Sequence, residues 1–232
     1  MRRLLKVVHL GRSPYAEVLE LQRNLCRQRA DGLQPDDLLL LVEHDPVFTL
    51  GRGTRPGSLP LPAEALHARG AALYEVERGG DVTFHGPGQL VGYPIIDLTM
   101  HREDLHWYLR ELESVLIESL GLLGVRGERS QGRTGVWVGD RKIASIGVHV
   151  KRWVTLHGFA LNVSTDLTWF DLIVPCGLPG VRMTAVAAEG GAPSTVDAVR
   201  AIVAPVFARR FGLAPILTEA GTLRPCAAVP GA

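Results

Sequence analysis

The stretch Arg78–Gln89, with the sequence RGGDVTFHGPGQ, constrains the fold of this 232-residue chain more than any other. Four glycines and one proline fall within these twelve residues, directly before the apolar run Leu90–Ile96. Glycine is used where the backbone needs a positive φ or where another group approaches closely, because a Cβ would clash there. The stretch also carries a cation, a hydroxyl and an imidazole. It is therefore either a ligand-binding loop or a tight hairpin with a solvated histidine.

The glycine spacing does not match the common nucleotide-binding loops. The stretch lacks Gly-x-x-x-x-Gly-Lys-Ser/Thr, and its glycines do not fit Gly-x-Gly-x-x-Gly at the start of a helix. We therefore do not expect it to hold a nucleotide phosphate in either of these two ways.

The length and composition fit a globular protein of one large domain or two small ones. A chain of this length buries roughly 70% or more of its unfolded surface, and 46% hydrophobic with 21% charged residues is ordinary for a soluble protein. A formal net charge of +1 gives no general attraction for nucleic acid or an anionic membrane. We find no credible signal peptide and no apolar run of membrane-spanning length, so we expect a cytoplasmic protein.

The three cysteines do not form a disulfide or zinc pattern. Cys26, Cys176 and Cys226 are an odd number and include no CxxC pair. Cys26 lies in a predicted helix among apolar residues, which is typical of a small core side chain.

The hydrophobic pattern predicts mixed helices and strands with several consecutive strands in the middle of the chain. This order favours an α/β (α+β) fold with a mixed β-sheet flanked by helices, in a single domain over 1–232. We expect a loosely ordered tail over 215–232. The predicted strands cover 4–10, 38–43, 72–76, 90–96, 135–138, 142–150 and 154–163. One predicted helix is capped by Ser13 and has Pro14 at its first position. The other predicted helices cover 63–69, 103–123, 167–173 and 195–211.

Two side chains stand out as candidates for chemistry. Cys176 lies between a proline and a glycine, off any regular element, where a thiol is accessible enough to act as a nucleophile. Lys142 opens an otherwise apolar strand. The alternative interpretations are a packing cysteine and a hairpin lysine that reaches solvent.

Five segments resemble one family of enzymes, the lipoyl(octanoyl) transferases. They are Glu43–Arg52 (EHDPVFTLGR), the glycine-rich stretch, Lys142–Gly147 (KIASIG), Leu156–Asn162 (LHGFALN) and Pro175–Gly177 (PCG). The resemblance extends from about Asp37 to Val186. It implies the catalytic fold of biotin and lipoate protein ligases, over about residues 30–214.

The resemblance also implies an activity. Octanoyl would pass from octanoyl-acyl carrier protein to a lysine of a lipoyl-accepting domain, as the first step of endogenous protein lipoylation. The implied acceptors are the lipoyl domains of 2-oxoacid dehydrogenase complexes and the glycine cleavage H protein. Since thioester exchange is nearly isoenergetic and thioester-to-amide transfer is downhill, we expect no cofactor, neither ATP nor a metal.

In this family the cysteine carries the acyl group as a thioester and the lysine activates it, which implies these roles for Cys176 and Lys142. An ammonium near the sulfur would stabilise the thiolate, because a free thiol titrates near ~8.5. The sequence departs from the family pattern near 183–186, a segment that is expected to form one wall of the site. The expected acyl pocket is lined by Arg78, Gly79, Gly80, Asp81, Val82, Thr83, Phe84 and His85, by Ser145, Ile146 and Gly147, and by Gly158, Phe159 and Ala160.

Two other functions fit the same residues. One is an ATP-dependent lipoate or biotin protein ligase on the same fold, which has no evident need for Cys176. The other is a non-catalytic acyl-binding module, which would bind without turnover. ATP dependence of product formation distinguishes the first, and turnover distinguishes the second.

Overall fold

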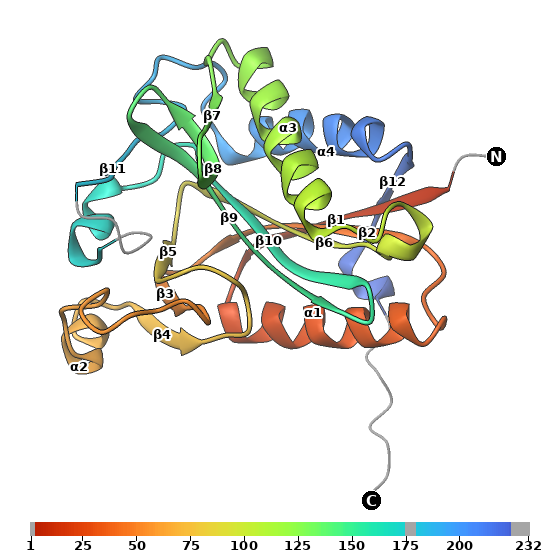
Figure 1. Ribbon diagram of the computed structural model, residues 1–232, viewed down its shortest axis with the longest axis horizontal. Coiled ribbons are helices and arrows are strands. Elements are labelled where there is room, and N and C mark those ends of the chain that lie inside the picture. Colours follow the sequence, from red (N-terminus) through yellow and green to blue (C-terminus); the bar gives the residue numbers. More distant parts are fainter. Residues whose placement is uncertain (1–2, 175–179, 224–232) are drawn as a thin grey trace, which may run out of the picture.

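A nine-stranded mixed sheet forms the centre of the computed structural model, which describes residues 3–174 and 180–223 (Figure 1). The strand order is β12-β1-β2-β6-β10-β9-β8-β7, and β11 pairs with β9. The strands are β1 (Leu4–Ser13), β2 (Asp37–His44), β6 (Gln89–Ile95), β7 (Glu128–Ser130), β8 (Arg133–Val138), β9 (Arg141–Lys151), β10 (Val154–Asn162), β11 (Arg182–Met183) and β12 (Ala214–Thr218).

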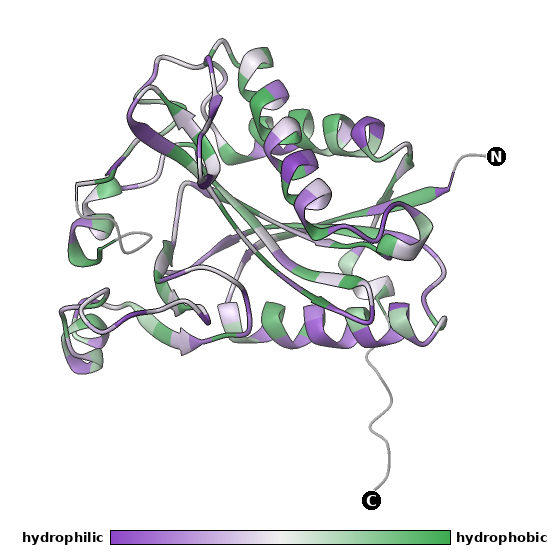
Figure 2. Ribbon diagram, viewed as in Figure 1, coloured by the Kyte–Doolittle hydropathy of each residue, from purple (hydrophilic) through white to green (hydrophobic). Residues whose placement is uncertain are grey.

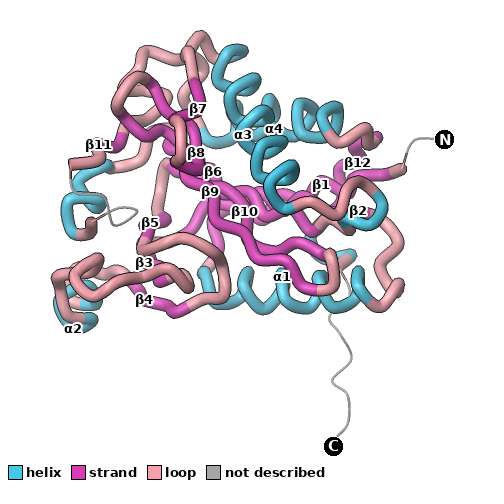
Figure 3. The backbone as a smooth tube through the Cα atoms, in the orientation of Figure 1, coloured by secondary structure: helices cyan, strands magenta, loops and turns pink. Residues whose placement is uncertain are grey.

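Three long helices cover the two faces of this sheet. Helix α1 (Tyr15–Ala30) lies on one face, and α3 (Leu105–Leu122) and α4 (Val196–Arg210) lie on the other (Figures 1 and 3). Strand β2 shows why both faces need a cover. Its residues alternate between the two sides: Leu38 and Leu40 pack in the α1 cluster, and Leu39 and Leu41 pack in the cluster of α3 and α4. The central strands are accordingly hydrophobic along most of their length (Figure 2), as expected for strands buried on both faces.

Side-chain caps fix the starts of two of these helices. The Asp104 carboxylate accepts a hydrogen bond from Trp107 N at the start of α3, and Thr195 Oγ1 accepts one from Ala198 N at the start of α4. Our prediction for α1 is wrong in detail: Pro14 occupies the cap position, and the Ser13 hydroxyl donates to Leu10 O instead of capping the helix.

A small second sheet lies beside the large one. It has the order β4-β3-β5, with β3 (Val47–Leu50), β4 (Ala72–Glu75) and β5 (Thr83–His85). Helix α2 (Ala63–His67) and the 3₁₀ helix η2 (Leu167–Leu172) pack on it through an aromatic cluster that contains Phe48, Phe84 and Phe170. The glycine-rich stretch begins between β4 and β5, contains β5 and ends at the first residue of β6, so it runs from the small sheet to the large one.

The predicted elements are confirmed, with ends that differ by a few residues. The fold class is likewise confirmed as a mixed sheet flanked by helices. The predicted loose tail is wrong at its start, because residues 214–218 form β12, which pairs in parallel with β1 from Leu4↔Ala214 to Val8↔Thr218. Residues 224–232 lie outside the described chain. No helix among the described residues is long and apolar enough to cross a membrane.

Gly92 in β6 should tolerate no side chain, because a Cβ there would lie 2.1 Å from the Phe159 ring. We expect Gly92→Ala to lower the free energy of unfolding by about 1–3 kcal/mol, the usual cost of overpacking. Gly121→Ala is the matched control, since nothing lies within 4 Å of a Cβ at this position of α3. It should be neutral or stabilising by up to about 1 kcal/mol. Urea unfolding of both variants measures the difference, and equal stability would contradict this packing.

Candidate active site

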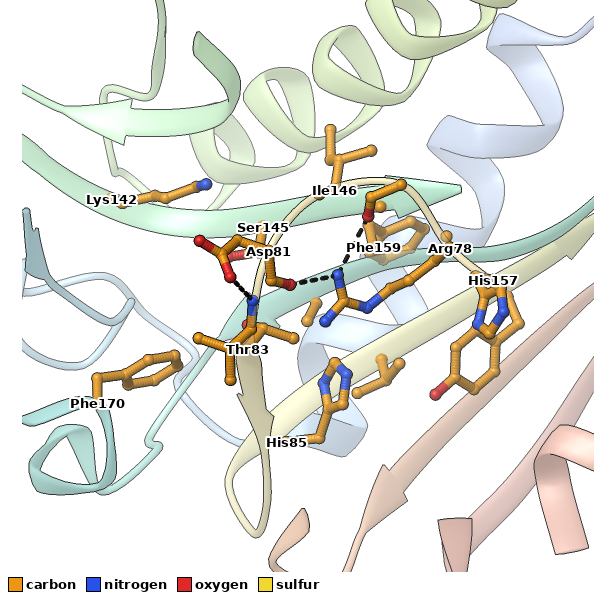
Figure 4. A pocket seen from close by; sticks show the side chains of 18 of the residues that line it. Arg78, Asp81, Thr83, His85, Lys142, Ser145, Ile146, His157, Phe159 and Phe170 are labelled. Atoms are coloured by element: carbon orange, nitrogen blue, oxygen red, sulfur yellow. Dashed lines mark hydrogen bonds between the residues drawn. The ribbon is translucent and has the colours of Figure 1, made fainter. Parts of the chain in front are cut away.

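A narrow cavity of about 60 Å³ lies between the glycine-rich stretch and the strands β6, β9 and β10 (Figure 4). A volume of this size holds only a few water-sized spheres, so it suits a slender ligand. Its lining residues come from seven parts of the chain: Tyr15; Arg78, Gly79, Gly80, Asp81, Val82, Thr83 and His85; Val91 and Tyr93; Lys142, Ser145, Ile146 and Gly147; His157, Gly158, Phe159 and Ala160; Phe170; and Met183.

Small residues allow the walls of the cavity to approach each other. In the β9–β10 register, Ser145 pairs with Ala160 and Gly147 with Gly158. A Cβ on Gly158 would lie 2.1 Å from Gly92 O, and one on Gly147 would lie 2.9 Å from Gly79 O. Glycine is therefore required where the glycine-rich stretch rests on β9 and where β10 meets β6.

Arg78 holds the glycine-rich stretch in place. Its buried guanidinium donates to Thr49 O at 2.6 Å and to Asp81 O at 2.7 Å, as well as to Gly79 O and Thr49 Oγ1. Figure 4 shows it at the middle of the cavity. These bonds join β3 to the stretch. Arg78 therefore combines a structural role with a fixed positive charge in the cavity wall.

Asp81 connects the same stretch to the loop that follows β3. Its carboxylate accepts hydrogen bonds from Val82 N at 2.6 Å and from the Ser58 hydroxyl at 2.7 Å. Both carboxylate oxygens are therefore engaged, which suits a structural role.

A chain of side-chain amides orients His85. Gln89 Nε2 donates to Asn162 Oδ1 at 2.9 Å, so Gln89 Oε1 is free to accept from His85 Nδ1 at 2.8 Å. Asn162 Nδ2 in turn donates to Thr184 O. This direction of bonding assigns the proton of His85 to Nδ1 and leaves a lone pair on Nε2. Burial lowers the pKa of His85 to about 3, so the ring is neutral near pH 7.

A second buried histidine, His44, holds one of the residues that line the cavity. His44 Nε2 accepts from the Tyr93 hydroxyl at 2.8 Å, and its Nδ1 donates to Ser13 O at 2.8 Å. Burial lowers the pKa of His44 to about 4. This pair fixes Tyr93, which lines the cavity.

Lys142 does not reach solvent, contrary to the alternative that the sequence left open. Its side chain is 3% exposed, and Nζ lies 5.6 Å from the centroid of the Trp137 ring. A Cβ on Gly135 of the neighbouring strand would lie 2.7 Å from Lys142 Cε. The missing side chain of Gly135 therefore makes room for the lysine, which projects toward the cavity (Figure 4).

Cys176 lies outside the described residues. The described segments on both sides of it border the cavity. Phe170 precedes it and Met183 follows it in the chain, and both line the cavity. Met183 also pairs with Lys142 in the parallel β9–β11 ladder, within the 183–186 segment where the sequence departs from the family pattern.

The structure brings the other expected site residues to one place, with one exception. Phe84 is not among the lining residues, and its ring packs in the aromatic cluster below, 5.1 Å from Trp169 and stacked on it. The reason is the alternation of β5, which directs Thr83 and His85 to one face and Phe84 to the other. Five further lining residues were not predicted from the sequence: Tyr15, Val91, Tyr93, Phe170 and His157, the last of which lies in the LHGFALN segment. Met183 lies in the segment that was expected to form one wall of the site.

The described part of the chain contains neither a metal site nor a reactive thiol. Residues 3–174 and 180–223 contain no group of three or more metal-binding side chains. Cys26 is buried in α1, and burial raises the pKa of its thiol to about 11. That thiol therefore stays protonated near neutral pH.

The sequence matches a known family and has close relatives in it. The family of the lipoyl protein ligase A/B catalytic domain matches residues 14–208. An octanoyltransferase of Gloeobacter violaceus is 50% identical over 226 residues, which cover 97% of each chain. An octanoyltransferase of Geobacter sulfurreducens is 50% identical over 204 residues, 88% of this chain and 83% of the relative.

Solved structures share the fold at low sequence identity. A lipoate-protein ligase A bound with ATP superposes with a TM-score of 0.76 at 16% identity, over 96% of this chain and 91% of the other. A biotin protein ligase from Aquifex aeolicus gives a TM-score of 0.51 at 11% identity, over 90% and 70% of the two chains. These similarities confirm the predicted fold.

The buried neutral His85 should make the protein less stable in acid. Since its pKa falls from 6.5 to about 3 on folding, the unfolded chain takes up a proton below pH 6.5 that the folded chain refuses. Its contribution to stability is present above pH 6.5 and is lost as the pH falls toward 3. We expect the loss of unfolding free energy between pH 7.5 and 5.0 to be smaller by about 2 kcal/mol in His85→Gln.

Urea unfolding at the two pH values measures this difference. His44 titrates in the same range but is present in both proteins, so it cancels. The control is His67→Gln, at an exposed position of α2, which should keep the pH dependence of the original chain. A His85→Gln variant with the same pH dependence would mean that His85 is protonated in the folded state.

Proposed function

This chain belongs to the family of the lipoyl protein ligase A/B catalytic domain, and from that premise we propose that it is an octanoyltransferase acting through an acyl-cysteine. The observation that carries the proposal is Lys142, a buried lysine directed into a narrow cavity with glycine and alanine in its walls. A straight acyl chain fits such a cavity, and an amine in its wall can serve as the proton carrier that acyl transfer needs.

We propose octanoyl-acyl carrier protein as the donor. The proposed acceptors are lipoyl domains of 2-oxoacid dehydrogenase complexes and the glycine cleavage H protein. Relatives that are 50% identical bear the name octanoyltransferase, which supports an acyl donor and a lipoyl-domain acceptor.

In the first proposed step, the Cys176 thiolate attacks the carbonyl carbon of the octanoyl thioester. The bond to the carrier sulfur breaks, and the carrier leaves as a thiol after taking a proton from the Lys142 ammonium. Before the attack, the same ammonium stabilises the thiolate. The product is an octanoyl thioester on Cys176.

In the second step, the ε-amine of the acceptor lysine attacks this thioester. Lys142, now neutral, takes a proton from the attacking nitrogen, an amide bond forms, and Cys176 leaves as a thiolate beside the regenerated ammonium. Two large protein substrates thus use one site in turn, so ping-pong kinetics are expected. His85 and Arg78 act as wall residues in this scheme, since a neutral oriented imidazole and an engaged guanidinium keep the cavity rigid.

The ligase alternative remains testable, since a lipoate-protein ligase with the same fold binds ATP. That function requires an acyl-adenylate and therefore ATP. Octanoyl transfer from a thioester in the complete absence of ATP would exclude it.

Incubation with octanoyl-acyl carrier protein alone should add one octanoyl group to a peptide that contains Cys176. The adduct should be labile to hydroxylamine, and acceptor domain should remove it without ATP. Cys176→Ala should form no adduct and should lose transfer on the order of 10³-fold or more. Cys26→Ala is the matched control, because that thiol is buried and protonated, and it should keep activity. Near-normal transfer by Cys176→Ala would exclude the acyl-cysteine and require direct aminolysis.

Lys142→Met should slow both half-reactions by about 10²–10⁴-fold, because it removes the proton carrier and keeps the apolar stem. Lys151→Met, at the exposed end of the same strand, is the matched control and should retain activity. Single-turnover kinetics measure acylation and deacylation separately, and the pH dependence of Cys176 alkylation reports its pKa. An unchanged thiol pKa in folded Lys142→Met would contradict the role of the lysine in activating the thiol.

A further inference from the structure

Lys142 and His157 lie at opposite ends of the cavity. The antiparallel β9–β10 register pairs His157 with Val148, which lies six positions beyond Lys142 on β9. At ~3.3 Å per residue these positions are about 20 Å apart along the strand. Figure 4 shows Lys142 and His157 on opposite sides of the cavity, with Arg78 between them.

His157 makes the far end polar, whereas the β9–β10 walls between Lys142 and His157 carry Gly147, Gly158, Phe159 and Ala160 beside the engaged Arg78 guanidinium. His157 is 2% exposed, and among the residues that the structure describes its Nε2 has no hydrogen-bond partner. The same holds for Nε2 of the buried Gln22 in α1. The Glu77 carboxylate lies beside this ring, with its Oε2 3.6 Å from His157 Nε2.

The backbone fixes the position of His157. Its φ is 58°, in the left-handed region that few residues other than glycine and asparagine occupy without strain. The Gln22 side chain accepts a hydrogen bond from His157 N at 2.9 Å, which helps to hold this conformation. The imidazole is therefore held in one position, where it forms the wall at this end of the cavity.

Behind this wall lies a separate groove. It has a volume of about 340 Å³ and runs between α1 and the β9–β10 hairpin, lined by Arg23, Cys26, Glu77, His149, Lys151 and Leu156 among others. Glu77 belongs to the groove and lies against His157, which belongs to the cavity. The pair of His157 and Glu77 thus separates the two spaces.

We propose that His157 sets the maximum length of the acyl chain that this protein accepts. The inference rests on the proposed octanoyl transfer. An acyl chain that starts beside Lys142 points its methyl end at His157, which Gln22 and Glu77 contact from the other side. A methylene buried against apolar walls contributes favourably to binding, but a methylene pressed against buried polar atoms gains nothing and prevents their hydration. Chains longer than the cavity are therefore rejected by its polar end.

The test is the variant His157→Gly, because glycine adopts a φ of 58° without strain and removes the wall. The rates of transfer from octanoyl and dodecanoyl thioesters of the same carrier are compared in one assay. We expect the dodecanoyl-to-octanoyl ratio to rise by about tenfold or more, since the longer chain can enter the groove behind. His149→Ala is the control, because this histidine lines the groove and not the cavity, and it should leave the ratio unchanged.

A second measurement separates this inference from the proposed function. Binding of free octanoic and dodecanoic acids, followed by isothermal titration, reports the length limit without any turnover. The ratio of their affinities should shift toward dodecanoic acid in His157→Gly even if no acyl group is transferred. His157→Asn, which also tolerates the left-handed conformation, should shift it less. A folded His157→Gly variant with the original preference in both assays would overturn the assignment of His157.

Discussion

The candidate site depends on one buried guanidinium. Arg78 cannot lose its charge in a protein, so its burial is tolerable only when oxygen atoms meet its N–H groups. Those oxygens belong to Thr49 on β3 and to Gly79 and Asp81 in the glycine-rich stretch. Neither segment can take its final position without the other, because each supplies part of the solvation that the cation requires. The roof of the cavity is therefore formed cooperatively with the small sheet.

Much of the fold could be predicted from the sequence, because the relevant signals are local. Apolar alternation and helical spacing depend on neighbouring residues, and the short turn at Gly139 already implies the β8–β9 hairpin. The glycines of the site are equally informative, since Gly147 and Gly158 indicate a close approach even when the partner is unknown. These signals identified the stretches that form the cavity and left its far end undefined.

The remaining features depend on contacts between distant parts of the chain. Lys142 is buried because Gly135, on the next strand, has no side chain there, and a lysine at the start of a strand does not reveal this. Tyr15 and Gln22 reach the site from α1, more than a hundred residues before His157. Phe84 could have been assigned correctly from strand alternation, had Thr83–His85 been recognised as a strand. Strand β12 is largely exposed and becomes recognisable through its pairing with β1.

The pairing of β12 with β1 affects how the chain folds while it is being synthesised on the ribosome. Strand β1 emerges early, but the neighbour that completes its outer edge is made about 200 residues later, roughly 10–40 s at ~5–20 residues per second. During that interval, the edge of β1 carries unpaired N–H and C=O groups next to apolar Leu5 and Val7. Until β12 has been synthesised, the exposed edge of β1 can pair with a wrong strand. Chaperone demand for this protein should accordingly concentrate on the time before β12 emerges.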